Sequence, residues 1–313
     1  STGVLNIQHA TATGTTAGGV SVTSGAALEI QGGITVGAEA LTLNGTGISS
    51  GGALRNISGN NSISGAITLG AASRINSDAD TLTLTGGITG AGLALTVGGS
   101  GNTTLSTSGL NTSTSGTLTK DGTGTLTITA TGDYTGATTV SAGILNIQNA
   151  TATGTTAGGV SVTSGAALEI QGAIAVGAEA LTLNGTGISS GGALRNISGN
   201  NSISGAITLG AATRINSDLN TLTLTGGITG VGFALTVGGV GNTTLSTSGL
   251  NTSTAATLTK DGTGTLTITA TGDYTGATTV SAGVLNIQNA TATGTTAGGV
   301  SVTSGAALEI QGA

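Results

Sequence analysis

The chain has 313 residues, of which 60 are glycine, and it contains no proline, cysteine, methionine or tryptophan. Only 6% of its residues are charged, the formal net charge is −6, and only Tyr134, Phe233 and Tyr274 are aromatic. This composition excludes an ordinary globular core of large side chains and predicts a thin aliphatic one. With so few basic groups we expect no nucleic-acid partner, and without a long, continuous apolar run we expect no membrane insertion in this segment.

The sequence is a tandem repeat. Residues 1–140 and 141–280 form two copies that are about 91% identical, and residues 281–313 begin a third. The first two copies differ at 13 positions: 2, 4, 9, 33, 35, 73, 79, 80, 91, 93, 100, 115 and 116. A repeat of this kind is typical of an array in which each unit packs on its neighbours. We therefore expect one continuous solenoid over residues 1–313, cut from a longer array.

Short strands are predicted throughout, because apolar residues alternate with small polar ones at period two. In chain order the runs are 20–22, 27–30, 34–36, 41–43, 67–69, 81–85, 93–97, 125–131 and 144–148. Nearly every run is bounded by Gly, Asn, Ser or Asp, which favour tight turns. No stretch has the spacing of an amphipathic helix, so we expect essentially no α-helix.

Short strands joined by tight turns fit a sandwich, a barrel or a solenoid. The small aliphatic side chains favour the solenoid, because they stack on their own kind and fill a narrow interior. Segments of about 23 to 28 residues between glycine-rich turns predict about six turns per copy and about 13 in all. At about 4.8 Å per turn, each copy would add about 28 Å of length.

One segment resembles a known family. Residues 118–148 read LTKDGTGTLTITATGDYTGATTVSAGILNIQ, and residues 258–288 repeat them with a single Ile-to-Val change. This segment resembles the passenger-associated repeat of bacterial autotransporters, whose recurrent positions fall on Lys120, Gly122, Gly124, Tyr134, Gly136, Thr139, Val140, Gly143 and Leu145. The resemblance implies a right-handed, single-stranded parallel β-helix that is exported and displayed on, or released from, the bacterial surface. It does not imply one activity, because passengers on this scaffold differ in function.

A calcium site is the one metal hypothesis, and it is weak. Asn76, Asp78 and Asp80 have the i, i+2, i+4 spacing of a calcium loop. The glycine after the third ligand and the distal glutamate are missing, and the second copy has Asn220 in place of Asp80. A structural turn explains the segment better, so we expect no metal and no cofactor.

The other chemical groups suit turns better than catalysis. Lys120 and Asp121 would serve as a base and its orienting acid, but Asp-Gly at this place is a strong turn signal. His9 is replaced by Asn149 and Asn289 in the other copies. The glycine-rich turns lack the following helix that a phosphate site needs. We therefore predict that the chain is not an enzyme.

Two further functions fit the strand faces less well. Ranks of threonine would suit ice binding, but equivalent positions vary among Thr, Ser, Asn, Glu and Arg. A polysaccharide-cleaving β-helix needs clustered charges and aromatic platforms, which the chain lacks.

The sequence therefore predicts an extracellular structural segment, a stalk, spacer or filament region of an autotransporter-like or adhesin-like surface protein. The alternative is a direct adhesion or self-association surface on the solenoid faces. The expected partners are further copies of the chain, stacked end to end because uncapped strands are templates for pairing, and ligands on host or bacterial cells.

Overall fold

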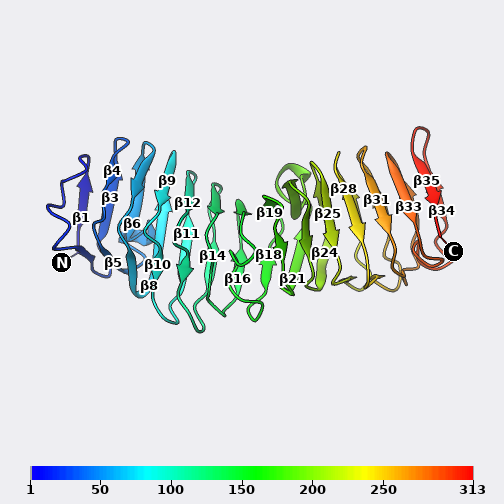
Figure 1. Ribbon diagram of the computed structural model, residues 1–313, viewed down its shortest axis with the longest axis horizontal. Helices are drawn as coiled ribbons and strands as arrows, with labels where there is room; N and C mark the ends of the chain where they lie inside the picture. Colours follow the sequence, from blue (N-terminus) through cyan, green and yellow to red (C-terminus); the bar gives the residue numbers. More distant parts are fainter. Residues whose placement is uncertain (1, 313) are drawn as a thin grey trace. The chain divides into compact units, whose positions relative to one another are not determined.

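The computed structural model describes residues 2–312, and the chain divides into two compact units, residues 1–159 and 160–313. Each unit is a coil of short strands that pair in parallel with strands of the turns before and after them, as Figure 1 shows. The predicted all-β parallel solenoid is confirmed, with about 14 turns instead of 13. That the units continue one another as one solenoid stays a prediction. The helical segments in the described residues are two 3₁₀ turns, η1 (Ile48–Ser50) and η2 (Ile188–Ser190).

The first unit has three columns of stacked strands, here called A, B and C. Column A contains β2 (Val20–Val22), β5 (Leu41–Gly45), the first part of β8 (Ile67–Ser77), β10 (Ile88–Thr89) and β13 (Leu110–Asn111). Column B contains β1 (Val4–Ile7), β3 (Ala27–Gln31), β6 (Leu54–Ser58), the last part of β8, β11 (Leu95–Gly98), β14 (Leu118–Lys120) and β16 (Thr138–Val140). Column C contains β4 (Thr35–Val36), β7 (Asn61–Ile63), β9 (Thr81–Leu84), β12 (Asn102–Leu105), β15 (Thr125–Ile128) and β17 (Ile144–Ile147).

The second unit also has three columns, which are lettered here in chain order within that unit. Column A contains β18 (Val160–Val162), β21 (Leu181–Gly185), the first part of β24 (Ile207–Ser217), β26 (Ile228–Thr229) and β29 (Leu250–Asn251). Column B contains β19 (Ala167–Gln171), β22 (Leu194–Ser198), the last part of β24, β27 (Leu235–Gly238), β30 (Leu258–Lys260), β32 (Thr278–Val280) and β34 (Val300–Val302). Column C contains β20 (Ala175–Val176), β23 (Asn201–Ile203), β25 (Thr221–Leu224), β28 (Asn242–Leu245), β31 (Thr265–Ile268), β33 (Val284–Ile287) and β35 (Ala307–Ile310).

The period-two alternation explains why each strand has an inner and an outer face. In column A of the first unit, Leu41 pairs with Ile67 and Ile67 with Ile88, and all three are buried. The neighbouring Thr68 and Thr89 pair with each other on the outer face. Like residues therefore stack in rows, and each turn is stabilised by its neighbours instead of by a core of its own.

The interior is not the purely aliphatic one that the sequence predicts. The largest fully buried side chains include two tyrosines and two lysines, Tyr134, Tyr274, Lys120 and Lys260.

The turns of the coil differ in length. Paired residues of consecutive turns lie between 19 positions apart, as in Thr125 with Ile144, and 28 positions apart, as in Gly45 with Ser73. Several turns are thus shorter than the sequence predicts, which explains the additional turn.

Glycine is required at some corners because successive turns touch there. A Cβ atom on Gly109 would lie 1.6 Å from the carbonyl oxygen of Thr131 in the next turn. Backbone cannot move aside as a side chain can, so these corners exclude every larger residue.

Candidate functional site: the charged column of each unit

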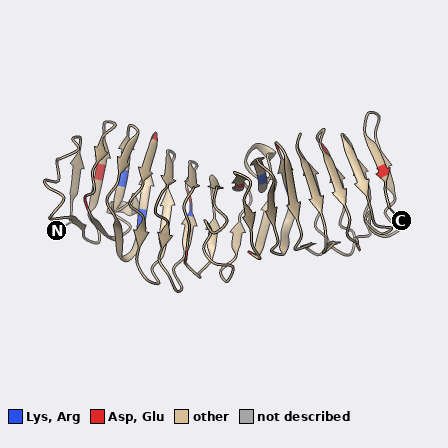
Figure 2. Ribbon diagram, in the orientation of Figure 1, with Lys and Arg blue, Asp and Glu red and all other residues tan. Residues whose placement is uncertain are grey.

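Charged side chains are sparse on the coil, as Figure 2 shows, and six of the nine in the first unit lie in column B strands or directly after them: Glu29, Arg55, Arg74, Asp78, Lys120 and Asp121. Strand register places Arg55 of β6 beside Glu29 of β3. The Arg55 NH1 atom lies 3.1 Å from Glu29 Oε1, and Nε donates to Asp78 Oδ2 at 2.7 Å. The hydrogen bond and the charge of Asp78 raise the pKa of Arg55. Arg55 therefore links three consecutive turns of the coil.

A second arginine links turns that are not adjacent. Arg74 of β8 binds Asp121, which follows β14, through two parallel hydrogen bonds of 2.7 and 2.8 Å. This two-point geometry is the strongest form of arginine–carboxylate pairing. Between them lies Gly98 of β11, where a Cβ atom would come within 2.0 Å of Asp121 Oδ1. The glycine makes room for an ion pair that passes over a whole turn.

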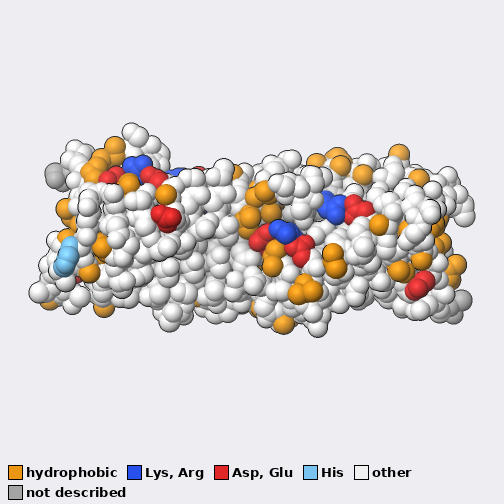
Figure 3. All heavy atoms as spheres, turned by 90° about the horizontal axis from the view of Figure 1, so that it is seen from above, with side chains coloured by type: hydrophobic (Ala, Val, Ile, Leu, Met, Phe, Trp, Pro, Cys, Tyr) orange, Lys and Arg blue, Asp and Glu red, His pale blue; other side chains and the backbone are white. Residues whose placement is uncertain are grey.

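The second unit repeats this arrangement. Arg195 lies 3.1 Å from Glu169 and also pairs with Asp218, while Arg214 binds Asp261 over Gly238. Figure 3 shows the blue side chains lying against red ones on a largely white surface. Every arginine of the chain is thus paired with a carboxylate of its own unit.

The lysine of each unit is buried at the end of a column B strand. Lys120 is 2% exposed, and its Nζ atom donates to the carbonyl oxygens of Asp121, Gly122 and Ala142 at 2.6, 2.9 and 3.2 Å. Burial lowers the pKa of Lys120 to about 8, and that of Lys260 likewise to about 8. The three ammonium hydrogens are matched by three acceptors. Lys120 meets the backbone of Asp121, whose carboxylate faces Arg74, so the two do not form a base with its orienting acid.

The tyrosine that follows this turn fills space inside the coil. Tyr134 is fully buried, and its hydroxyl lies 2.7 Å from Thr138 Oγ1, which in turn donates to the carbonyl of Thr153. Tyr274 is buried in the same way, and burial raises its pKa to about 12. A buried aromatic ring with a bonded hydroxyl fills and fixes the turn.

The residues of the calcium hypothesis lie together at the end of β8, where protein donors bind their oxygens. Asn76 Oδ1 accepts from Arg74, Asp78 accepts from Arg55 and from the Asn76 amide, and Asp80 accepts from the Gly59 amide at 2.7 Å. In the second unit the Gly199 amide donates to Asn220 Oδ1 at 3.0 Å. Asp80 and Asn220 both have positive φ, which these residue types tolerate. A neutral acceptor thus does the same work as the carboxylate.

His9 is also interchangeable with asparagine. The Thr11 amide donates to His9 Nδ1 at 3.3 Å, and the Thr151 and Thr291 amides donate to Asn149 and Asn289 at 3.0 Å. Within residues 2–312, no three His, Cys, Asp or Glu side chains are grouped to hold a metal ion. Glu39 is 2% exposed, and its Oε1 atom accepts no hydrogen bond from the described part of the chain.

The described helices include none that is long and apolar enough to cross a membrane.

The second copy exposes four apolar side chains at positions where the first copy has smaller ones. Its exposed apolar side chains include Leu219 (55% exposed), Val231 (70%), Phe233 (37%) and Val240 (72%). The residues at these positions in the first copy are Ala79, Ala91, Leu93 and Ser100. Four of the 13 differences between the copies therefore enlarge exposed apolar side chains.

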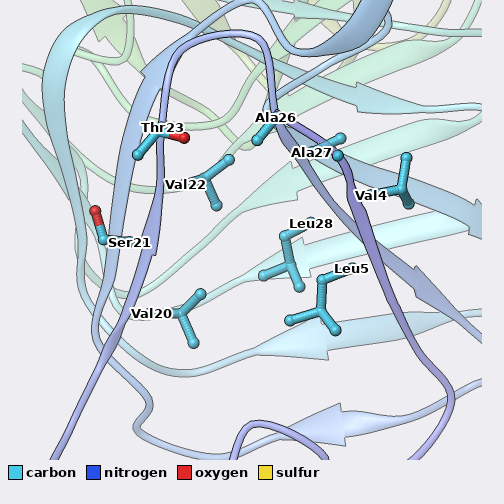
Figure 4. Close-up of a pocket in the computed structure, with 10 residues that line it drawn as sticks. Val4, Leu5, Val20, Ser21, Val22, Thr23, Ala26, Ala27 and Leu28 are labelled. Carbon is cyan, nitrogen blue, oxygen red and sulfur yellow. The ribbon is translucent and has the colours of Figure 1, made fainter. Parts of the chain in front are cut away.

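A hollow of about 260 Å³ lies among the first strands, with Leu5, Val20 and Leu28 directed into it in Figure 4. In the next copy, Leu145 and Val160, the residues equivalent to Leu5 and Val20, are fully buried. The lining of the hollow is mostly aliphatic, its polar side chains are those of Ser21 and Thr23, and it includes no charged residue.

Sequence reasoning missed the role of the charged residues. Arg55, Arg74 and Lys120 gave no local pattern, because their partners Glu29, Asp121 and Ala142 lie 26, 47 and 22 positions away in the chain. The spacings of these pairs recur in the second copy, where Arg195 pairs with Glu169 and Arg214 with Asp261.

The family of passenger-associated transport repeats matches the chain twice, at residues 118–147 and 258–287. These matches cover β14 to β17 and β30 to β33, including the buried lysine and tyrosine. No curated protein and no solved structure matches the chain. The repeat implies a secreted or cell-surface protein. The chain thus carries two passenger-associated transport repeats on a parallel β-solenoid, which is consistent with the passenger of an autotransporter.

Proposed function

We propose that the chain is a non-enzymatic structural segment, a stalk or spacer, of a secreted or cell-surface passenger. The observation that carries this proposal is that the basic side chains bind groups of the chain itself. All six lysine and arginine side chains bind carboxylates or carbonyls of their own unit. Among the described residues, no lysine or arginine is without such a partner. These ion pairs and hydrogen bonds link neighbouring turns of the coil.

The spacer proposal predicts that length, and not sequence, carries the function. The test removes residues 141–280 from the intact, displayed protein, or duplicates them, and measures how far a terminal tag stands from the membrane. Each repeat should change this distance by about 30 Å, from about 4.8 Å per turn, while attachment to host or bacterial cells stays unchanged. Loss of attachment on deletion would overturn the spacer function.

An adhesive or self-associating surface is the second candidate, and the exposed apolar side chains of the second copy favour it. Exposed apolar side chains that lie close together mark interaction sites more often than single ones do, and Leu219 and Val240 follow the column B strands of consecutive turns, β24 and β27. The test replaces the four residues by those of the first copy, L219A, V231A, F233L and V240S. The reciprocal variant, A79L, A91V, L93F and S100V, is the matched control. If attachment or self-association falls with the first variant and rises with the second, the surface binds. If neither changes, the spacer function stands alone.

A further inference from the structure

Strands that are equivalent by sequence occupy different columns within one unit. In the second unit, β19 lies in column B, where it pairs with β22. Its equivalent in the following copy is β35, which pairs with β33 in column C. Likewise β18 lies in column A, and its equivalent β34 pairs with β32 in column B. Each equivalent strand has moved forward by one column.

The first unit shows the same shift independently. β1 pairs with β3 in column B, with Asn6 beside Glu29. Its equivalent β17 pairs with β15 in column C, with Asn146 beside Thr127. The two units thus agree on the direction and the size of the step.

The step gives the number of turns in one repeat. From β20 to β35, column C advances by six pairings, through β23, β25, β28, β31 and β33. β19 precedes β20 by one column, so the full repeat from β19 to β35 makes six and a third turns. The physical cause is that the lengths of the turns, set by their strands and corners, do not add up to a repeat after a whole number of turns.

We propose that each repeat is rotated by a third of a turn about the coil axis relative to the repeat before it. Equivalent faces then point in the same direction again after three repeats. At about 4.8 Å per turn, the nineteen turns of three repeats span about 91 Å.

This winding limits how a second copy lies alongside the first. A neighbouring solenoid that matches one face stays in register for only one repeat, because the face then turns away. Side-by-side contact between solenoids would depend on matching side chains of their faces, because strand pairing runs only along the coil axis. The winding therefore opposes bundling while leaving end-to-end strand pairing free. The winding itself does not depend on the spacer function, whereas its benefit against bundling does.

The test uses pairs of cysteines, because the natural chain has none. The pairing places Asn286 beside Glu309 and Thr279 beside Ser301. With a whole number of turns, β35 would instead stack on β32 and bring Thr279 beside Glu309. Neighbouring parallel strands lie within the distance that a disulfide spans.

We expect N286C/E309C and T279C/S301C to form disulfides in the folded protein with at least about tenfold higher yield than T279C/E309C. N6C/E29C is the control from the first unit, and circular dichroism of the reduced proteins confirms that each variant folds. A dominant T279C/E309C disulfide would overturn the winding. A three-repeat array that bundles face to face in electron micrographs, with the first two disulfides formed, would leave the winding intact and remove only the proposed benefit.

Discussion

The two copies of the repeat differ almost only where they meet solvent. Among the 13 differences, positions 73 and 116 are the two where both copies bury the residue. At position 73 the substitution keeps the chemistry: Ser73 and Thr213 each donate a hydroxyl to two carbonyls, at 3.1 and 2.8 Å and at 3.2 and 2.8 Å. The exposed positions vary from Ser100 to Val240 and from Ala79 to Leu219. Each interior side chain packs against two neighbouring turns, whereas the exposed side chains at most of these positions contact mainly solvent.

The largest expected effect comes from removing a buried residue that both copies share. Y134A or Y274A should lower the free energy of unfolding by about 3 to 5 kcal/mol, because the lost ring leaves a cavity. Y134F and Y274F, which remove only the hydroxyl bonded to Thr138 or Thr278, should cost about 1 kcal/mol. Urea denaturation of each variant measures the difference. Equal costs for alanine and phenylalanine would show that the ring does not support the turn.

The buried lysines should make stability depend on pH in both copies. The pKa of Lys120 and Lys260 is lowered to about 8 in the folded protein from an ordinary value of 10.5. Between these values the unfolded chain binds more protons, so the free energy of unfolding should rise with pH. The slope should approach about 1.4 kcal/mol per pH unit for each lysine. Denaturation at several pH values across this interval measures it, and K120M/K260M should remove the slope. A slope that survives in the double variant would contradict the assignment.

A smaller loss of stability is expected from substituting Gly98, because side chains and not backbone lie next to it. G98A should open the ion pair between Arg74 and Asp121, because its Cβ meets only the ends of these flexible side chains. The expected cost is about 1 kcal/mol, the typical value of a strong surface pair. In a background with R74Q the same substitution should cost less, and this double-mutant cycle isolates the ion pair. G109A is the contrast, since its Cβ would meet backbone, and it should cost several times more.

The smallest effect is expected from exchanging the outer surfaces of the copies. The variant L219A, V231A, F233L and V240S should change the free energy of unfolding by less than about 0.5 kcal/mol for each substitution. Thermal unfolding measures this change, and sedimentation of the same variant reports self-association. A large loss of stability would mean that these side chains pack within the unit, contrary to their exposure.

Much of the fold could be predicted from the sequence, and little of the charged column. Strands such as β9 and β15 follow directly from TLTL and TLTI, because alternation is a local property. The resemblance to the passenger-associated repeat rested on residues 118–148 and is confirmed by the family match at 118–147 and 258–287. The sequence predicts Lys120 in a turn, but its buried position depends on the carbonyl of Ala142, which another turn supplies.

The sequence by itself predicted a solenoid of small stacked side chains, because strand alternation, glycine corners and the tandem repeat are all visible in the order of the residues. Its parallel arrangement was implied by the resemblance of residues 118–148 to the passenger-associated repeat. Only the tertiary structure decided which turn lies on which. The partners of Arg55 and Arg74, the burial of Lys120 and the winding of six and a third turns all depend on register. The residues that a strand pairs with depend on the lengths of all the turns between them, and these lengths are unequal. A local sequence pattern therefore cannot predict the pairing.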